Sequence, residues 1–407
     1  MRRISTPSTP ALSDLRVAIV GSGPTGLMAA ARLSGRPGIR VDLFERRAGF
    51  GRKLLVAGSS GLNISHDLPA EEFASHYAGG TPAFWSGLLA DFGPPEWIAF
   101  IENELGLETF RGTSRRYFVR EMKASGLLAA WRKRLEAGGV RLHGNSELKD
   151  FRREGGSLRL SFGDGRECEA DRVLFALGGG SWEDVPPFWP DLFRAKGFEV
   201  EPFASANAGH AVEWSPAFLA EAEGKPLKKI RFGNRRGEKD GELVVTRYGL
   251  EGTPVYFLGE PGDAWIDLKP DLTEAAILAR LEAVKENFAP IRRVKLKLDL
   301  CEASLALLFH HVSEAERRDL RTLVARVKRF PIRLGSARPL AEAISSTGGL
   351  AFSELDDSLE LRKIPGTYAG GEMIAWHAPT GGFLIQAAVS MGARLADSVL
   401  RSSGKPA

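Results

Sequence analysis

The sequence predicts an α/β protein built on a Rossmann-like nucleotide-binding domain, and three observations support this class. An apolar strand at 17–20 runs into a glycine-rich turn and then into a helix rich in Ala and Leu. A second apolar strand at 39–44 follows and ends in an acidic residue. The chain has 407 residues, which is long for one core, so a second domain is expected.

The bulk composition is that of an ordinary globular protein, with 43% hydrophobic and 26% charged residues. The formal net charge of +4 is too small to indicate nucleic acid as a partner. Cys168 and Cys301 form no CxxC pair, so we expect no metal site and no redox-active disulfide. Such cysteines are typical of a cytoplasmic protein.

Neither end of the chain predicts a membrane or export segment. No uninterrupted apolar run approaches the roughly 18 residues that a membrane span needs, so no membrane contact is expected. Residues 1–13 are rich in Ser, Thr and Pro, and no apolar stretch follows Arg2 and Arg3. We therefore expect a disordered tail there and a cytoplasmic location.

The glycine-rich turn carries the GxGxxG pattern in the context that confirms it, between a strand and a helix. The first glycine lets the chain turn tightly, the second lets backbone approach a pyrophosphate, and the third lets the helix pack close to the strand. The N–H groups at the start of the helix then face the diphosphate. The predicted dinucleotide-binding residues of this turn are Gly21, Gly23, Pro24, Thr25 and Gly26.

The acid at the end of the second strand is Glu45, nineteen residues after Gly26. This is close to the spacing at which a carboxylate hydrogen-bonds the adenosine ribose. An arginine such as Arg46 can accept a 2′-phosphate, which would indicate NADP, but the neighbouring acid would repel that phosphate. We therefore assign the ribose to Glu45 and expect Arg46 on the adenine side or in solvent.

The segment 49–65 favours FAD over a nicotinamide cofactor. A nicotinamide-binding domain would continue here with a helix and a third strand, whereas this segment holds two adjacent cations and then Gly, Ser and Asn. The cations can neutralise a diphosphate, and the small residues can bring backbone donors against a planar ring. A flexible basic loop is the alternative. The candidate residues are Arg52, Lys53, Gly58, Ser59 and Asn63.

The motifs from residue 17 to residue 65 resemble the HI0933-like (YhiN/BaiN-type) family of FAD-dependent flavoproteins. That family carries GxGxxGLMAA, an acid-ended strand and GRKxLxxGxGxxNxS. The resemblance covers nearly the whole chain. It implies an FAD-binding domain of the two-dinucleotide-binding type, formed by residues 14–187 and 337–407. Such a domain is Rossmann-like and has three layers (ββα). It also implies an inserted β-barrel-plus-helices domain at 188–336 that roofs the flavin and shapes the substrate cavity.

The middle of the chain supplies a third apolar strand, at 172–177, which ends in glycines. Gly178 and Gly179 permit close backbone approach to a cofactor at the carboxyl end of this strand. A β-meander is predicted just before it, at 158–171. Because no second GxGxxG and no CxxC follow, the sequence argues against the glutathione-reductase type.

The C-terminal part contains two further glycine-rich motifs. A short strand ends in Gly371 and Glu372, which places a carboxylate next to the ribityl chain. A helix then starts directly after two glycines, and its N-terminus would stabilise the anionic reduced flavin at the N1/O2 edge. The residues assigned to this helix start are Thr380, Gly381, Gly382 and Phe383.

His377 lies between these two elements and is the candidate catalytic acid or base, with a structural histidine as the alternative.

The resemblance implies an NAD(P)H-dependent reductase of a small organic substrate, with electrons or hydride passing through flavin N5. Two alternatives stay open: a flavin oxidase or monooxygenase that uses O₂, and an RNA-associated flavoprotein that modifies or binds tRNA. The basic run at 225–236 is more typical of a solvated face than of a nucleic-acid site. The sequence does not determine the oligomeric state.

Overall fold

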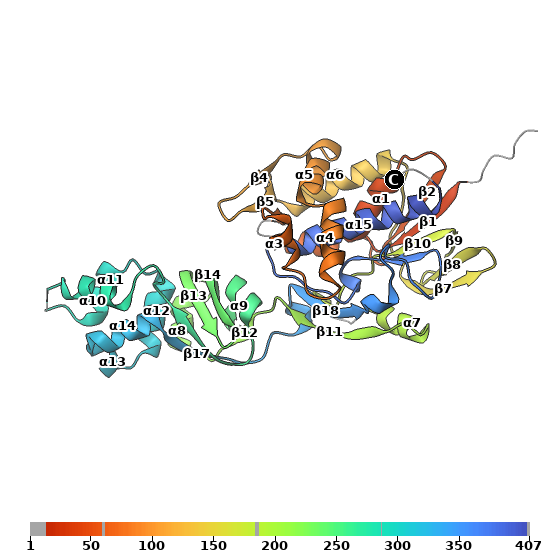
Figure 1. Ribbon diagram of the computed structural model, residues 1–407. Coiled ribbons are helices and arrows are strands. Elements are labelled where there is room, and N and C mark those ends of the chain that lie inside the picture. Colours follow the sequence, from red (N-terminus) through yellow and green to blue (C-terminus); the bar gives the residue numbers. More distant parts are fainter. Residues whose placement is uncertain (1–13, 59–61, 184–186, 286, 405–407) are drawn as a thin grey trace, which may run out of the picture. The chain divides into compact units, whose positions relative to one another are not determined.

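The computed structural model describes residues 14–58, 62–183, 187–285 and 287–404 (Figure 1). The predicted tail at 1–13 lies outside the described residues. The chain forms two compact units. Unit 1 holds residues 1–179, 185–203 and 347–407, and unit 2 holds residues 180–184 and 204–346.

The centre of unit 1 is a parallel sheet of five strands, which confirms the predicted Rossmann-type fold. Strand β1 pairs in parallel with β2 on one side and with β10 on the other. The carboxyl ends of these strands therefore meet at one edge, where such domains bind their cofactors. The strand order is β19 (Thr367–Ala369), β10 (Arg172–Phe175), β1 (Leu15–Val20), β2 (Ile39–Phe44) and β6 (Arg141–His143).

The predicted β-meander forms a second layer against this sheet. It consists of β7 (Leu148–Glu154), β8 (Ser157–Phe162) and β9 (Glu167–Ala170). Aromatic contacts join the layers: the Phe151 ring lies 4.6 Å from that of Phe175, and the Phe162 ring lies 4.4 Å from that of Phe44. The helical layer contains α1 (Pro24–Leu33), α6 (Ala124–Ala137) and α15 (Phe383–Ser402), with α15 beside α1 (Figure 1).

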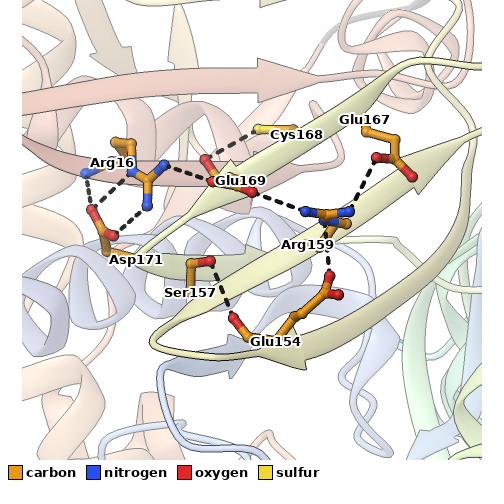
Figure 2. A network of polar contacts seen from close by, with 8 residues as sticks. All are labelled: Arg16, Glu154, Ser157, Arg159, Glu167, Cys168, Glu169 and Asp171. Carbon is orange, nitrogen blue, oxygen red and sulfur yellow. Dashed lines mark hydrogen bonds and ion pairs between the residues drawn. The ribbon is translucent and has the colours of Figure 1, made fainter.

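Charged side chains tie the edge of the meander to β1, as Figure 2 shows. Arg16 donates to Asp171 from its backbone N and from its guanidinium, each at 2.8 Å. Its guanidinium also lies 3.3 Å from Glu169, which in turn accepts a hydrogen bond from Arg159 at 3.1 Å. The network fixes the last turn of the meander before the chain enters β10.

The segment between β2 and the meander adds a smaller sheet and several short helices to unit 1. The antiparallel sheet contains β3 (Asn63–His66), β5 (Arg116–Val119) and β4 (Thr109–Arg111). The helices are α2 (Arg52–Ala57), α3 (Ala70–Ala74), α4 (Pro82–Asp91), α5 (Pro94–Ala99) and the π-helix η1 (Phe100–Glu104).

The expectation that no helix and strand follow β2 was wrong, because α2 and β3 occupy 52–66. Gly51 adopts the left-handed conformation (φ 66°) that lets the chain turn into α2. Residues such as Arg, Lys, Leu and Ala have high helix propensity, and the buried Leu54 anchors the helix to the core.

Unit 1 also retains residues 188–203, which the sequence assigned to the inserted domain. Helix α7 (Trp189–Ala195) directs the Phe193 ring to within 5.2 Å of the Phe151 ring and 5.3 Å of the Phe175 ring. Because of these aromatic contacts, α7, which follows the glycines after β10 in the sequence, still belongs to the core of unit 1. The chain then forms β11 (Val200–Ala206), which pairs with β18 (Ser345–Leu350).

Unit 2 is an antiparallel sheet with helices, in keeping with the expected inserted domain. Backbone hydrogen bonds from Gly335 to Ala211 (2.7 Å) and from Ala211 to Ser336 (3.1 Å) join β12 to the segment after β17, so the sheet closes on itself. The strand order is β12 (His210–Ala211), β15 (Gly249–Glu251), β14 (Gly237–Thr246), β13 (Pro226–Asn234), β16 (Gly262–Asp267) and β17 (Phe330–Leu334). The helices are α8 (Pro216–Ala222), α9 (Thr253–Leu258), α10 (Glu274–Glu282), α11 (Pro290–Lys297), α12 (Glu302–His311), α13 (Glu314–Arg318) and α14 (Leu320–Lys328).

Helix α15 is long and apolar enough to cross a bilayer by length and composition, with a mean hydropathy of 1.3 in its apolar window. However, 72% of that window is buried inside the protein. A core helix of a globular domain has both properties, so α15 is weak evidence for a membrane span.

The Arg16–Asp171 pair gives a testable contribution to stability. Burial alone would raise the pKa of Asp171, but the hydrogen bonds from Arg16 outweigh it and hold the pKa below its ordinary value of 3.8. The contribution is therefore present above pH 3.8 and is lost as the pH falls through the folded-state pKa. Since the two side chains are 38% and 31% exposed, we expect Asp171→Asn to lower the free energy of unfolding by only about 1 kcal/mol near neutral pH.

Urea unfolding at neutral pH and at a pH below the Asp171 pKa measures this effect. Glu167→Gln is the matched control, because its carboxylate lies 3.6 Å from Arg159 at the exposed edge of the same network. An Asp171→Asn deficit that is equally large at both pH values would contradict the assignment.

Candidate functional site

The turn between β1 and α1 packs backbone against backbone. Gly21 has φ 106°, and a Cβ on it would lie 2.1 Å from the Ala176 carbonyl oxygen. A Cβ on Gly26 would lie 1.9 Å from the Gly21 carbonyl oxygen. At Gly23, by contrast, no protein atom of the described chain lies within 4 Å of such a Cβ. The first and third glycines therefore serve the fold, while the second faces the side from which a diphosphate can approach.

The start of α1 offers unpaired donors to such a group. Pro24 occupies the first turn, no side chain caps the helix, and the first turn holds no acidic residue. Orphan N–H groups and the helix dipole then favour an anion at this end.

The ribose-binding acid predicted from spacing is held in place by a residue that the sequence analysis missed. Glu45 accepts hydrogen bonds from the Ser22 backbone N (3.1 Å), from the Ser22 hydroxyl (2.5 Å) and from the Arg47 backbone N (3.0 Å). The Ser22 hydroxyl also accepts from the Gly51 backbone N at 3.1 Å. Ser22 thus fixes the carboxylate next to the glycine turn, whereas the side chain of Arg46 is exposed.

Lys53 connects three segments that lie far apart in the sequence. Its Nζ donates to the Gly179 carbonyl oxygen at 2.7 Å and lies 3.6 Å from a Glu372 carboxylate oxygen. Gly178, in the left-handed region at φ 76°, is adjacent, since its Cβ would lie 3.8 Å from the same Nζ. If Lys53 binds a diphosphate, its positive charge is divided between the diphosphate and the Glu372 carboxylate.

The short 3-10 helix η4 (Gly371–Met373) brings Glu372 to the start of α1. Gly371 has φ 80°, and a Cβ on it would lie 2.4 Å from the Thr25 hydroxyl oxygen. The chain therefore requires glycine here to let η4 approach α1. The structure brings Thr25, Lys53, Gly178, Gly179, Gly371 and Glu372 together at the carboxyl edge of the sheet.

A buried polar network clamps β3 onto the start of α15. The Ser65 hydroxyl donates to the Gln386 side-chain oxygen at 2.7 Å, and the Gln386 side-chain nitrogen donates to Ser390 at 3.1 Å. Ser390 in turn donates to the Phe92 carbonyl oxygen at 2.6 Å. Gly382 (φ 102°) leaves room for this contact, because a Cβ on it would lie 2.5 Å from the Ser65 carbonyl carbon.

Three buried polar atoms next to this clamp have no hydrogen-bond partner in the described part of the chain: Asn63 Oδ1, His66 Nδ1 and Arg116 Nε. Arg116 Nε lies 3.2 Å from where a Cβ of Gly381 would stand. Burial, and next the charges of Arg116 and Arg115, lower the pKa of His66. Burial also lowers the pKa of Arg116.

These orphaned atoms fit the flavin half of FAD, whose ring edge carries both donors and acceptors. The two ends of the site also have a suitable separation. Gly392 of α15 packs on the backbone of Thr25, and Gly382 lies ten residues before it. At 1.5 Å per residue this is about 15 Å, a span that a ribityl chain and part of the flavin ring can cover.

The remaining predicted residues have other surroundings. A Cβ on Gly58 would lie 2.3 Å from the Ala124 Cβ, so close packing against α6 accounts for a glycine at this position. The Phe383 ring is 4% exposed and stacks on the His76 ring at 4.5 Å, which leaves only its backbone N–H for a ligand. His377 is exposed, and its backbone pairs with that of Ala78. Arg52 and Thr380 are half-buried, and Ser59 lies outside the described residues.

His66 carried no signal in the sequence, whereas Arg116 stands among three arginines at 115–120 that could bind an anion or face solvent; the sequence does not predict that either residue lies near the helix start. A β-bulge between Asn63 and Ser65 shifts the register of β3, and the pairing of β3 with β5 then sets His66 opposite Arg116. Within the described residues, no group of three or more His, Cys, Asp or Glu side chains could hold a metal ion.

The fold and the site define the class of protein, an FAD-dependent oxidoreductase with a Rossmann-type domain. Within that class the chain belongs to the HI0933-like family. The family model described as the HI0933-like protein Rossmann domain matches residues 15–398.

Two curated relatives match nearly the whole chain. The 3-dehydro-bile acid delta(4,6)-reductase of Clostridium scindens is 23% identical over 402 residues, which cover 93% of this chain and 97% of the relative. The ribosomal RNA dihydrouridine synthase of Escherichia coli is 22% identical over 383 residues, covering 90% and 94%. A solved 3-ketosteroid-delta4-(5alpha)-dehydrogenase from Rhodococcus jostii aligns over 98% of this chain and 99% of its own, with 14% identity and a TM-score of 0.49.

Substitutions at two glycines of the β1–α1 turn should affect different properties, FAD binding at Gly23 and stability at Gly26. We expect Gly23→Ala to leave the stability of the flavin-free protein unchanged, because its φ of −68° suits alanine and no atom of the described chain lies within 4 Å of the new Cβ. The same change should weaken FAD binding at least about tenfold, since the methyl group would stand where the diphosphate approaches. Gly26→Ala should instead lower the free energy of unfolding by about 1–3 kcal/mol, because its Cβ collides with backbone.

Thermal unfolding and FAD titration of the flavin-free variants measure both effects. Gly156→Ala, in the open turn between β7 and β8, is the matched control for adding a methyl group to a glycine with no neighbours. Equal FAD affinity of Gly23→Ala and the unmodified chain would refute a diphosphate at this turn.

His66 predicts a pH dependence of stability. Because its folded-state pKa lies below the ordinary value of 6.5, the unfolded chain binds more protons between the two values. Protonation of His66 should therefore leave the stability of the flavin-free protein unaffected above pH 6.5 and lower it as the pH falls through the folded-state pKa of this group. We expect His66→Gln to reduce this slope in urea unfolding; an unchanged slope would show that His66 does not titrate as described.

Proposed function

We propose that the protein is an NAD(P)H-dependent reductase of a small organic substrate that carries a carbon–carbon double bond conjugated to a carbonyl group. The names of both curated relatives support this chemistry, since a delta(4,6)-reductase and a dihydrouridine synthase each add hydrogen to such a bond. FAD supplies hydride transfer through flavin N5 when bound. The protein supplies the geometry and the electrostatic environment.

The observation that carries the proposal is the start of α15. The first hydrogen bond inside this helix runs from Gln386 N to Gly382 O, at 3.0 Å. The N–H groups of residues 383–385 therefore have no acceptor inside the helix, and the first turn holds no acidic side chain. A positive helix end next to the ring favours the reduced, negatively charged state that a reductase must hold between donor and acceptor.

NAD(P)H is proposed as a transient donor, because the chain carries a single GxGxxG turn, which FAD would occupy. Donor and substrate would then use the flavin in turn, which gives ping-pong kinetics. We also propose a cytoplasmic location, where both half-buried cysteines stay reduced.

A second candidate function is reduction of a base in RNA. The relative from Escherichia coli is named for that activity, and α11 exposes Arg292, Lys295 and Lys297 without an acidic residue in the helix. Binding through such a face would depend steeply on salt concentration.

Anaerobic reduction by NADH or NADPH, followed by mixing with an acceptor, tests the proposal. The flavin absorbance should bleach with one of the two donors and recover with an α,β-unsaturated ketone at least about tenfold faster than with air-saturated buffer. Rapid recovery in air with formation of hydrogen peroxide, and none with the ketone, would identify an oxidase instead. Recovery only with a uridine-containing RNA transcript would favour the second candidate.

A further inference from the structure

We propose that Arg116 is a positioning residue for the flavin, which places a positive charge on the N1–C2=O2 edge of the ring and raises its affinity for electrons. The inference requires FAD in this site but is independent of the donor and the substrate. It therefore stands or falls separately from the proposed reductase activity.

The position of Arg116 follows from strand pairing. Arg116 on β5 faces His66 on β3, and β3 is clamped to α15 through Ser65 and Gln386. The guanidinium lies over Gly381, with Nε at 3.2 Å and Cζ and Nη2 at 3.6 Å from where a Cβ would stand. The charge is thus held at the N-terminal end of α15, where the helix dipole is also positive.

The charge of Arg116 is uncompensated, unlike that of its neighbours. Arg111 and Arg115 each lie within 4.0 Å of Asp67, and Arg120 pairs with Glu108. Within the described residues no carboxylate lies within ion-pair distance of Arg116, and its buried Nε has no acceptor. An unpaired, partly buried charge is unfavourable unless a ligand provides hydrogen-bond acceptors for it.

The chemistry of the neighbouring groups favours the flavin over a substrate carboxylate. A carboxylate would need donors alone. The site combines the donors of Arg116 and of the α15 start with the orphaned acceptor Asn63 Oδ1. The pyrimidine edge of flavin matches this set, because the acceptors N1 and O2 lie beside the donor N3–H. The separation of about 15 Å from Thr25 along α15 is consistent with this placement.

The midpoint potential of bound FAD and its affinity for sulfite test the inference in the holoprotein. Sulfite binds oxidised flavin more tightly when a positive charge stands near N1 and O2. We expect Arg116→Gln to lower the midpoint potential and to weaken sulfite binding at least about tenfold, which is about 1.4 kcal/mol. Arg116→Lys, which keeps the charge but lacks the planar fork, should shift both quantities less.

Arg120→Gln is the matched control, because Arg120 lies on the same segment, is exposed and pairs with Glu108; both quantities should stay unchanged. An unchanged midpoint potential and sulfite affinity in Arg116→Gln, with a raised KM for substrate, would overturn the inference and assign Arg116 to the substrate. If Arg116→Gln does not retain FAD, Arg116→Met, a second neutral variant, is measured in its place: a lowered midpoint potential supports the inference, and an unchanged one overturns it.

Discussion

The close packing of α15 on the start of α1 is the contact on which the site depends. Gly392 lies against the backbone of Thr25, where a Cβ would be 2.4 Å from the carbonyl oxygen. This contact fixes the N-terminal end of α15 at about 15 Å from the diphosphate-binding turn. Helix α15 therefore sets the length of cofactor that α1 can hold, and that length suits FAD.

The electrostatic character of the site comes from the same arrangement. At the first end, the start of α1 has no side-chain cap and no acidic residue in its first turn, and Lys53 shares its charge with Glu372 and a backbone carbonyl. At the second end, the first turn of α15 holds no acidic residue, and no carboxylate of the described chain lies within ion-pair distance of Arg116. The ion pair of Lys53 with Glu372 is compatible with a group whose charge does not change. The unpaired positive charge of Arg116 and of the α15 start would stabilise a ring that gains negative charge when it is reduced.

Local motifs made much of this predictable from the sequence. Gly21, Gly26 and Glu45 follow from spacing along one strand–turn–helix unit, and the three central strands of the parallel sheet, β10, β1 and β2, follow from their apolar runs. The parts that could not be predicted depend on tertiary contacts. His66 and Arg116 meet through a bulged strand pairing, and α7 joins unit 1 through aromatic packing. Helix α2 was missed because the glycines around it masked its good local propensity.

The identity and amount of the flavin released from the purified protein test the central claim most directly. One cofactor is expected to span both the glycine turn and the start of α15. Denaturation and chromatography should therefore yield FAD at one equivalent per chain. FMN lacks the adenosine half that the glycine turn and Glu45 are predicted to bind. Release of FMN, or a colourless protein that FAD cannot reconstitute, would contradict the account.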